Sequence, residues 1–88
     1  MAINYERMKR VFPKQKAALT RARKITDPIK CKDAVIATCK TTVHEWDEIG
    51  AWPDAWATWQ RTLDDAIWEA RRAGFDPPAF YPSRLEDL

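Results

Sequence analysis

The stretch from His44 to Glu48, which reads HEWDE, comes closest to a chemical motif. It begins like the helix of zinc proteases in which two histidines, four residues apart, hold the metal. The position of the second histidine holds Glu48, so that helix face carries no ligand pair. Cys39 and Cys31 lie more than one and more than three helical turns from His44, too far to complete a site. We therefore expect no metal site, and we interpret the acidic residues as a solvated face near a helix end.

No other set of residues indicates catalysis. Asp64, Asp65 and Glu69 could act as general acid and base only in a concave apolar pocket, but their spacing places them on the polar side of a helix. A chain with two glycines has no glycine-rich phosphate loop. The sequence therefore predicts no catalytic residue, no cofactor and no enzymatic activity.

Charge is distributed unevenly along the chain, although the net charge is only +2. Residues 1–42 hold 11 Lys or Arg against 3 Asp or Glu, a balance of +8; residues 43–88 hold 4 against 10, a balance of −6. In a helical first segment, five basic residues fall on one side: Arg7, Arg10, Lys14, Arg21 and Lys24.

This basic stripe has three interpretations, which stay open. It could contact an acidic protein, it could neutralise the phosphates of a nucleic acid, or the acidic half of the chain could neutralise it within the molecule. The acidic half would repel a nucleic-acid backbone, and no helix-turn-helix spacing accompanies the stripe. We therefore expect a protein partner more than a nucleic acid.

Tryptophan is abundant, with five residues in 88. Four of them fall on apolar seams at helical spacing, which predicts a place in the core: Trp46, Trp52, Trp56 and Trp59. Trp68 lies about 150° around the helix from that seam, among polar residues that include Arg61 and Arg72. Because Trp and Arg are enriched in binding hot spots, Trp68 is either covered by the C-terminal tail or contacts a partner together with Arg61 and Arg72.

The elements that must position these residues are helices. Asp27 followed by Pro28 is typical of a helix start, and Gly50 of a helix end. A heptad seam from Trp52 to Ala73 indicates a second helix, closed by Gly74. The chain therefore predicts one all-α domain, 1–88: a small helical bundle built on a central antiparallel hairpin (27–74), with helices at about 28–49 and 53–73.

The segments on either side of the hairpin differ in character. Residues 1–25 form a basic helical segment in which Asn4 is a candidate N-cap, and Pro13 either kinks this helix or splits it in two. The tail, 75–88, contains three prolines, so we expect it to be extended and to fold back along the hairpin.

The cysteines and the hydropathy of the chain indicate where in the cell the protein is located. Cys31 and Cys39 would lie ~12 Å apart along one helix and ~80° apart around it, too far to bridge within that helix. Two free, buried thiols are typical of a reducing cytoplasm, although a thiol that links a dimer or acts in redox chemistry stays an alternative. Uncharged runs are far shorter than the ~20 residues of a membrane span, and no leader opens the chain. We expect a cytoplasmic protein that does not bind membranes.

The segment His44 to Asp65, with HEWDEIGAWPDAW followed by WQR and LDD, resembles small proteins of actinobacterial phages and of their hosts' genomes. Most of those proteins have no assigned activity, so the resemblance supplies no catalytic or binding residue. It implies a phage-encoded binding module that docks on a bacterial host protein and modulates or inhibits it. The alternatives are a nucleic-acid-binding accessory protein, acting through the basic stripe, and an oligomeric or virion component.

Overall fold

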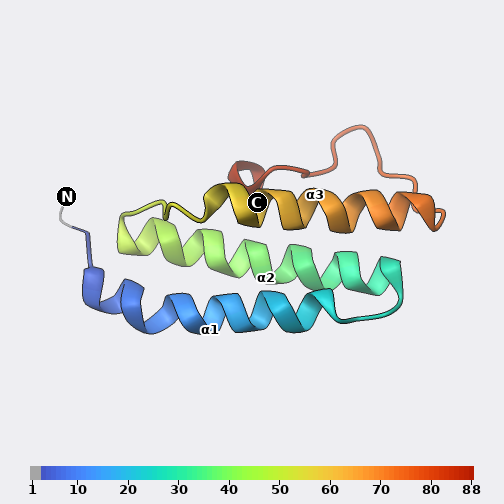
Figure 1. The fold of residues 1–88 in the computed structure, drawn as a ribbon. Helices are drawn as coiled ribbons and strands as arrows, with labels where there is room; N and C mark the ends of the chain where they lie inside the picture. The colour runs from blue at the N-terminus through green and yellow to red at the C-terminus, as the bar shows by residue number, and fades with distance from the viewer. Residues whose placement is uncertain (1–2) are drawn as a thin grey trace.

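The computed structural model describes residues 3–88 and contains three α-helices followed by one 3-10 turn (Figure 1). The elements are α1 (Tyr5–Arg23), α2 (Pro28–Ile49), α3 (Trp56–Arg72) and η1 (Leu85–Asp87). The predicted all-α class is confirmed, and the described residues contain no strand.

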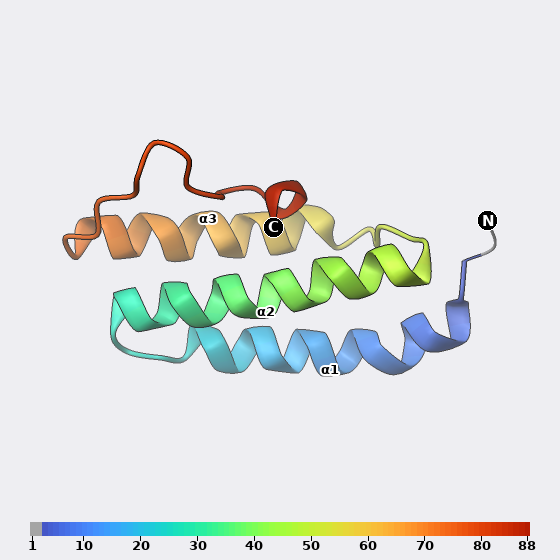
Figure 2. The same cartoon turned by 180° about the vertical axis from the view of Figure 1, so that it is seen from behind.

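Helix α2 is the centre of the fold. Figures 1 and 2 show it between α1 and α3, with each neighbour running antiparallel to it. Both outer helices pack along α2 and far less against each other. The expected antiparallel hairpin is therefore present, and α1 adds a third helix to its other side.

Local signals in the sequence explain most of the helix ends. The side chain of Asn4 accepts a hydrogen bond from the Arg7 amide at 3.1 Å, and that of Asp27 accepts one from the Ile29 amide at 3.0 Å. Gly50 follows α2 with φ +84°, and the next amide, that of Ala51, reaches back to the Trp46 carbonyl at 3.2 Å. Only glycine adopts this left-handed conformation without steric cost, so Gly50 allows the sharp turn toward α3.

Pro13 lies inside α1 and does not split it. The helix continues from Tyr5 to Arg23, and both views show its first turns inclined to the remainder. Proline causes such a bend because it lacks an amide donor and its ring crowds the preceding turn. Of the two alternatives, the kinked helix is the one observed.

The predicted start of α3 was wrong by one turn. We expected the helix to begin at residue 53, but Pro53 belongs to a turn in which its carbonyl accepts from the Trp56 amide at 3.0 Å. This turn brings the Trp52 and Trp56 rings together, with their centroids 4.5 Å apart. The proline signal therefore placed the start too early, and α3 begins at Trp56, whose ring packs against Trp46 and Trp52.

A tryptophan cluster forms the core at one end of the bundle. The centroid of the Trp46 ring lies 5.5 Å from that of Trp59, 5.7 Å from that of Trp56 and 6.0 Å from that of Trp52. Trp46 and Trp59 are buried as predicted, and Trp56 is partly buried. Trp52 is 52% exposed, so its predicted place in the core was wrong. Trp52 lies at the edge of the cluster, in the connection between α2 and α3, and one face of its ring is open to solvent.

The C-terminal tail doubles back along α3, as expected (Figure 1), and its 3-10 turn η1 contacts both α2 and α3. The side-chain amide of Gln60 makes two hydrogen bonds to the tail. Its Nε2 donates to the Ser83 carbonyl and its Oε1 accepts from the Leu85 amide, each at 2.9 Å. The Leu85 side chain is fully buried against α2 and α3. Nearer α2's start, the Lys32 ammonium lies 3.7 Å from the centroid of the Phe75 ring, a cation–π contact that attaches the other end of the tail.

The burial of Leu85 predicts that the tail contributes to stability. Leu85→Ala should lower the free energy of unfolding by roughly 2–4 kcal/mol, because it removes buried methyl groups and leaves a cavity. Phe80→Ala is the matched control in the same tail, since Phe80 is 99% exposed; it should change stability by less than about 0.5 kcal/mol. Urea denaturation measures both, and equal effects would show that the tail is not docked.

Candidate binding groove

An open groove lies between α1 and α3, because both helices pack on α2 and not closely on each other. Its middle part is a hollow of about 460 Å³. The apolar lining comes from Phe12 and Leu19 of α1, Trp59 of α3, and Ala55 just before α3. Thr58 and Thr62 form the α3 rim. We call this feature, together with its extension described next, the α1–α3 groove.

The groove widens toward the start of α1. A second hollow of about 620 Å³ shares Phe12 and Ala55 with the first, so the two are continuous. Tyr5 and Met8 line it from α1, and Trp52 lines it from the turn before α3. Tyr5 and Trp52 are both more than half exposed, so this end of the groove presents aromatic surface to solvent.

An ion pair joins the two walls at the opposite end of the groove. The guanidinium of Arg23 on α1 donates to both carboxylate oxygens of Glu69 on α3, each at 3.3 Å. This hydrogen bonding is the main reason why the pKa of Arg23 is raised. The charge of Arg23 is therefore compensated within the molecule.

The remaining charges of the groove are mostly basic. Lys9, Lys16 and Lys24 line it and are exposed. Asp54, at the Trp52 end, is the one acidic residue in the lining of the two hollows. The groove thus combines an apolar floor with a positively charged wall on α1.

The basic stripe does not form one surface. Arg10, Lys14 and Arg21 are exposed, and helical geometry places them roughly 160° around α1 from Phe12 and Lys16. They occupy the edge of α1 opposite the groove, whereas Lys24 of the stripe, which directly follows α1, lines the groove itself.

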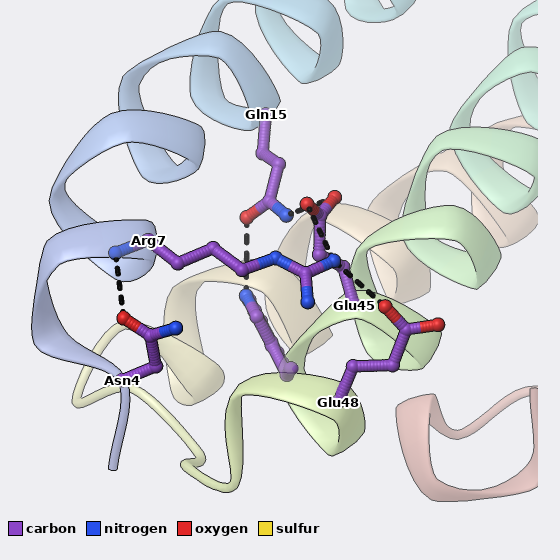
Figure 3. A network of polar contacts seen from close by, with 6 residues as sticks. Asn4, Arg7, Gln15, Glu45 and Glu48 are labelled. Atoms are coloured by element: carbon purple, nitrogen blue, oxygen red, sulfur yellow. Dashed lines mark hydrogen bonds and ion pairs between the residues drawn. The ribbon is translucent and has the colours of Figure 1, made fainter.

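Arg7 is engaged within the molecule. Its Nη2 atom lies 2.7 Å from Glu48 and 3.5 Å from Glu45, both on α2 (Figure 3). The hydrogen bond to Glu48 is the main cause of the raised pKa of Arg7. Internal neutralisation, one of the three interpretations of the stripe, therefore applies at Arg7, which joins the start of α1 to the end of α2.

Trp68, Arg61 and Arg72 share the ridge of α3 that faces away from α2. Trp68 is 59% exposed, and the tail passes beside it, with Ser83 lining the same small hollow of about 190 Å³. The tail therefore borders Trp68 without covering it. Because α1 and α3 pack on opposite sides of α2, this ridge and the Arg10 edge lie at opposite sides of the molecule, so the fold does not bring these two candidate contact surfaces together.

The sequence contained a signal for the groove. Tyr5, Met8, Phe12 and Leu19 form an apolar arc on α1 that extends beyond the part facing α2. The sequence did not single out Lys9 and Lys16, which line the groove beside this arc. The α3 rim could not be assigned, since Thr58 and Thr62 carry no chemical signature of their own.

The other candidate residues show no site. Cys31 and Cys39 are free and buried, and the Cys31 thiol donates to the Ala22 carbonyl at 3.3 Å. Burial raises the pKa of the Cys39 thiol to about 12, which keeps it protonated and unreactive at neutral pH. His44 is exposed. Within residues 3–88, no three His, Cys, Asp or Glu side chains are placed to hold a metal ion.

The Cys39 thiol predicts a dependence of stability on alkaline pH. The folded chain keeps this proton up to about pH 12, whereas the unfolded chain releases it near the ordinary value of 9.0. Between these values the unfolded chain binds fewer protons, so the stabilisation present below pH 9 is lost as pH rises. In urea denaturation at about pH 8 and pH 10.5, Cys39→Ala should lose less unfolding free energy than the unsubstituted chain; an equal loss would contradict this assignment.

Comparisons with known proteins add no relative. No family model matches the chain, and searches of curated proteins and of solved structures give no match. The resemblance of residues 44–65 to actinobacterial phage proteins stays a prediction. Among the described residues, no helix is both long enough and apolar enough to cross a bilayer.

Proposed function

We propose that this chain is a small, non-enzymatic protein-binding module that takes a segment of another protein into the α1–α3 groove. The observation that carries the proposal is the groove itself: the partly exposed Phe12 lies beside the buried Leu19 and Trp59 on its floor, and the apolar lining continues to the exposed rings of Tyr5 and Trp52. Contiguous exposed apolar surface with a polar rim is typical of protein interaction sites.

The contrast between two grooves of the same bundle supports this function. The chain's own tail fills the groove between α2 and α3, where Leu85 is fully buried and Tyr81 and Leu88 pack against the core. In residues 3–88 no corresponding segment lies over the α1–α3 groove, which stays accessible. The chain thus closes one groove with its own residues and leaves the other for a partner.

The biological role that fits this module is modulation of a bacterial host protein, in line with the resemblance to phage proteins. A segment held in the groove is withdrawn from the contacts that it makes elsewhere, so docking would inhibit or redirect the partner. No step of this role requires a catalytic group, a metal or a cofactor.

The two alternative functions have less support. A nucleic-acid-binding protein would use Arg10, Lys14 and Arg21 on the outer edge of α1, but Arg7 is already paired with Glu45 and Glu48. Phosphate contacts also give no role to the apolar floor. An oligomeric or virion component would place a second copy in the groove, and the experiments below detect that outcome.

Filling the groove should abolish partner capture. Thr58→Trp places an indole in the groove, whereas Ala57→Trp places one on an exposed position one residue earlier, outside the groove. In affinity capture from an actinobacterial lysate, the Ala57→Trp protein should retain the partners of the unsubstituted chain. The Thr58→Trp protein should lose them by at least about tenfold, as expected for a blocked hot spot.

Circular dichroism of both variants provides the control for folding. Full capture by a folded Thr58→Trp protein would contradict the groove as the binding site. Loss of capture by Trp68→Ala, with capture by Thr58→Trp retained, would instead move the contact to the outer ridge of α3.

A further inference from the structure

The shape of the α1–α3 groove matches a helix. Its α1 wall extends from Tyr5 to Arg23 and is therefore about 27 Å long, at 1.5 Å per residue. Helices α1 and α3 each run antiparallel to α2 and flank it, and with an open groove between them they present the same arrangement as three members of a four-helix bundle. A fourth helix of about 18 residues would span the groove.

Backbone hydrogen bonding also favours a helix over an extended strand. The walls of the groove are helices, whose internal amides and carbonyls are already paired with each other. An extended segment on the apolar floor would find no backbone partners there, and burying unpaired backbone groups is costly. A helix satisfies its own backbone and presents only side chains to Phe12, Leu19 and Trp59.

The charges of the groove select an acidic helix. Lys9, Lys16 and Lys24 are exposed along the α1 wall, and Arg23 is compensated by Glu69. The single opposing charge in the lining is Asp54, at one end. Carboxylates on the partner's flank would lie near these lysines, while lysines on that flank would be repelled.

The tail shows the same pattern in the neighbouring groove. In η1, the buried side chain of Leu85 points to the core, while Glu86 and Asp87 stay exposed beside it. The bundle thus already accommodates a short helical segment with an apolar anchor and acidic neighbours. The α1 wall of the α1–α3 groove, about 27 Å long, has room for more than one such anchor.

From these observations we infer that the occupant of the α1–α3 groove is an acidic amphipathic helix of another protein, about five turns long, which completes a four-helix bundle. This inference rests on the proposed function and specifies the partner's chemistry. The partner helix carries apolar residues at i, i+3, i+4 and i+7 for the floor, and Asp or Glu on the flank that faces α1.

Selection from a peptide library tests the inference. One library displays 18-residue peptides with apolar residues fixed at helical spacing and random residues on the flanks. A second library of the same length is fully random, and both are selected for binding to the full chain. Counter-selection on the Thr58→Trp protein removes peptides that bind elsewhere. The expected result is enrichment of the helical library with Asp and Glu on one flank; groove-dependent peptides without acidic enrichment, or with proline-rich extended sequences, would overturn the acidic helix.

Charge reversal then tests which surface recognises the selected peptides. Lys9→Glu combined with Lys16→Glu should weaken binding of an acidic peptide at least about tenfold. Arg10→Glu combined with Arg21→Glu makes the same change of charge on the same helix, at the edge away from the groove, and should weaken it less than about threefold. A peptide whose flank is changed from Glu to Lys should bind the Lys9→Glu, Lys16→Glu protein more tightly than it binds the unsubstituted chain.

The outcomes separate the inference from the proposed function. If groove-dependent peptides are selected but equal effects follow from both pairs of charge reversals, the groove binds proteins and the acidic helix is wrong. If no peptide depends on the groove, both proposals fail. If sedimentation shows a dimer that Thr58→Trp disrupts, a second copy of the chain occupies the groove, which also overturns the inference.

Discussion

The packing of Trp46 is the interaction on which the rest of the structure depends. Its indole is buried on α2, contacts the rings of Trp52, Trp56 and Trp59 around the turn and α3, and donates from Nε1 to the Gln15 side chain on α1 at 3.1 Å. Gln15 is only 8% exposed and in turn donates to Glu45 at 3.3 Å. One buried side chain therefore joins all three helices, and the polar contact fixes the register of α1 against α2.

Because α1 and α3 both pack on α2, the surface of the molecule has a groove on each side of α3. A domain of this size buries a smaller fraction of its surface than a larger one, because its ratio of surface to volume is high. The tail resolves this on the α2–α3 side through Leu85, held by Gln60. On the α1–α3 side the groove stays open, because the tail docks on the other side of α3.

The sequence alone predicted what short-range physics determines. Asn4, Asp27 and Gly50 act on groups within a few residues, and the helix ends near them were placed correctly. Interactions distant in sequence decided the features that were missed. Arg7 pairs with residues 38 and 41 positions away, which removes it from the predicted binding surface. The groove likewise needs two helices that are not adjacent in the chain, so the apolar arc on α1 indicated one wall but no local pattern indicated that α3 forms the other.

Photo-cross-linking in cells tests the central claim, that the groove is the surface that meets a partner, most directly. A photoreactive amino acid in place of Thr20, which lines the groove, is compared with one in place of the next residue, Arg21, on the outer edge of α1. We expect a cross-link to one partner protein from position 20 and none to that protein from position 21. A cross-link from position 21 alone, or none from position 20, would contradict it.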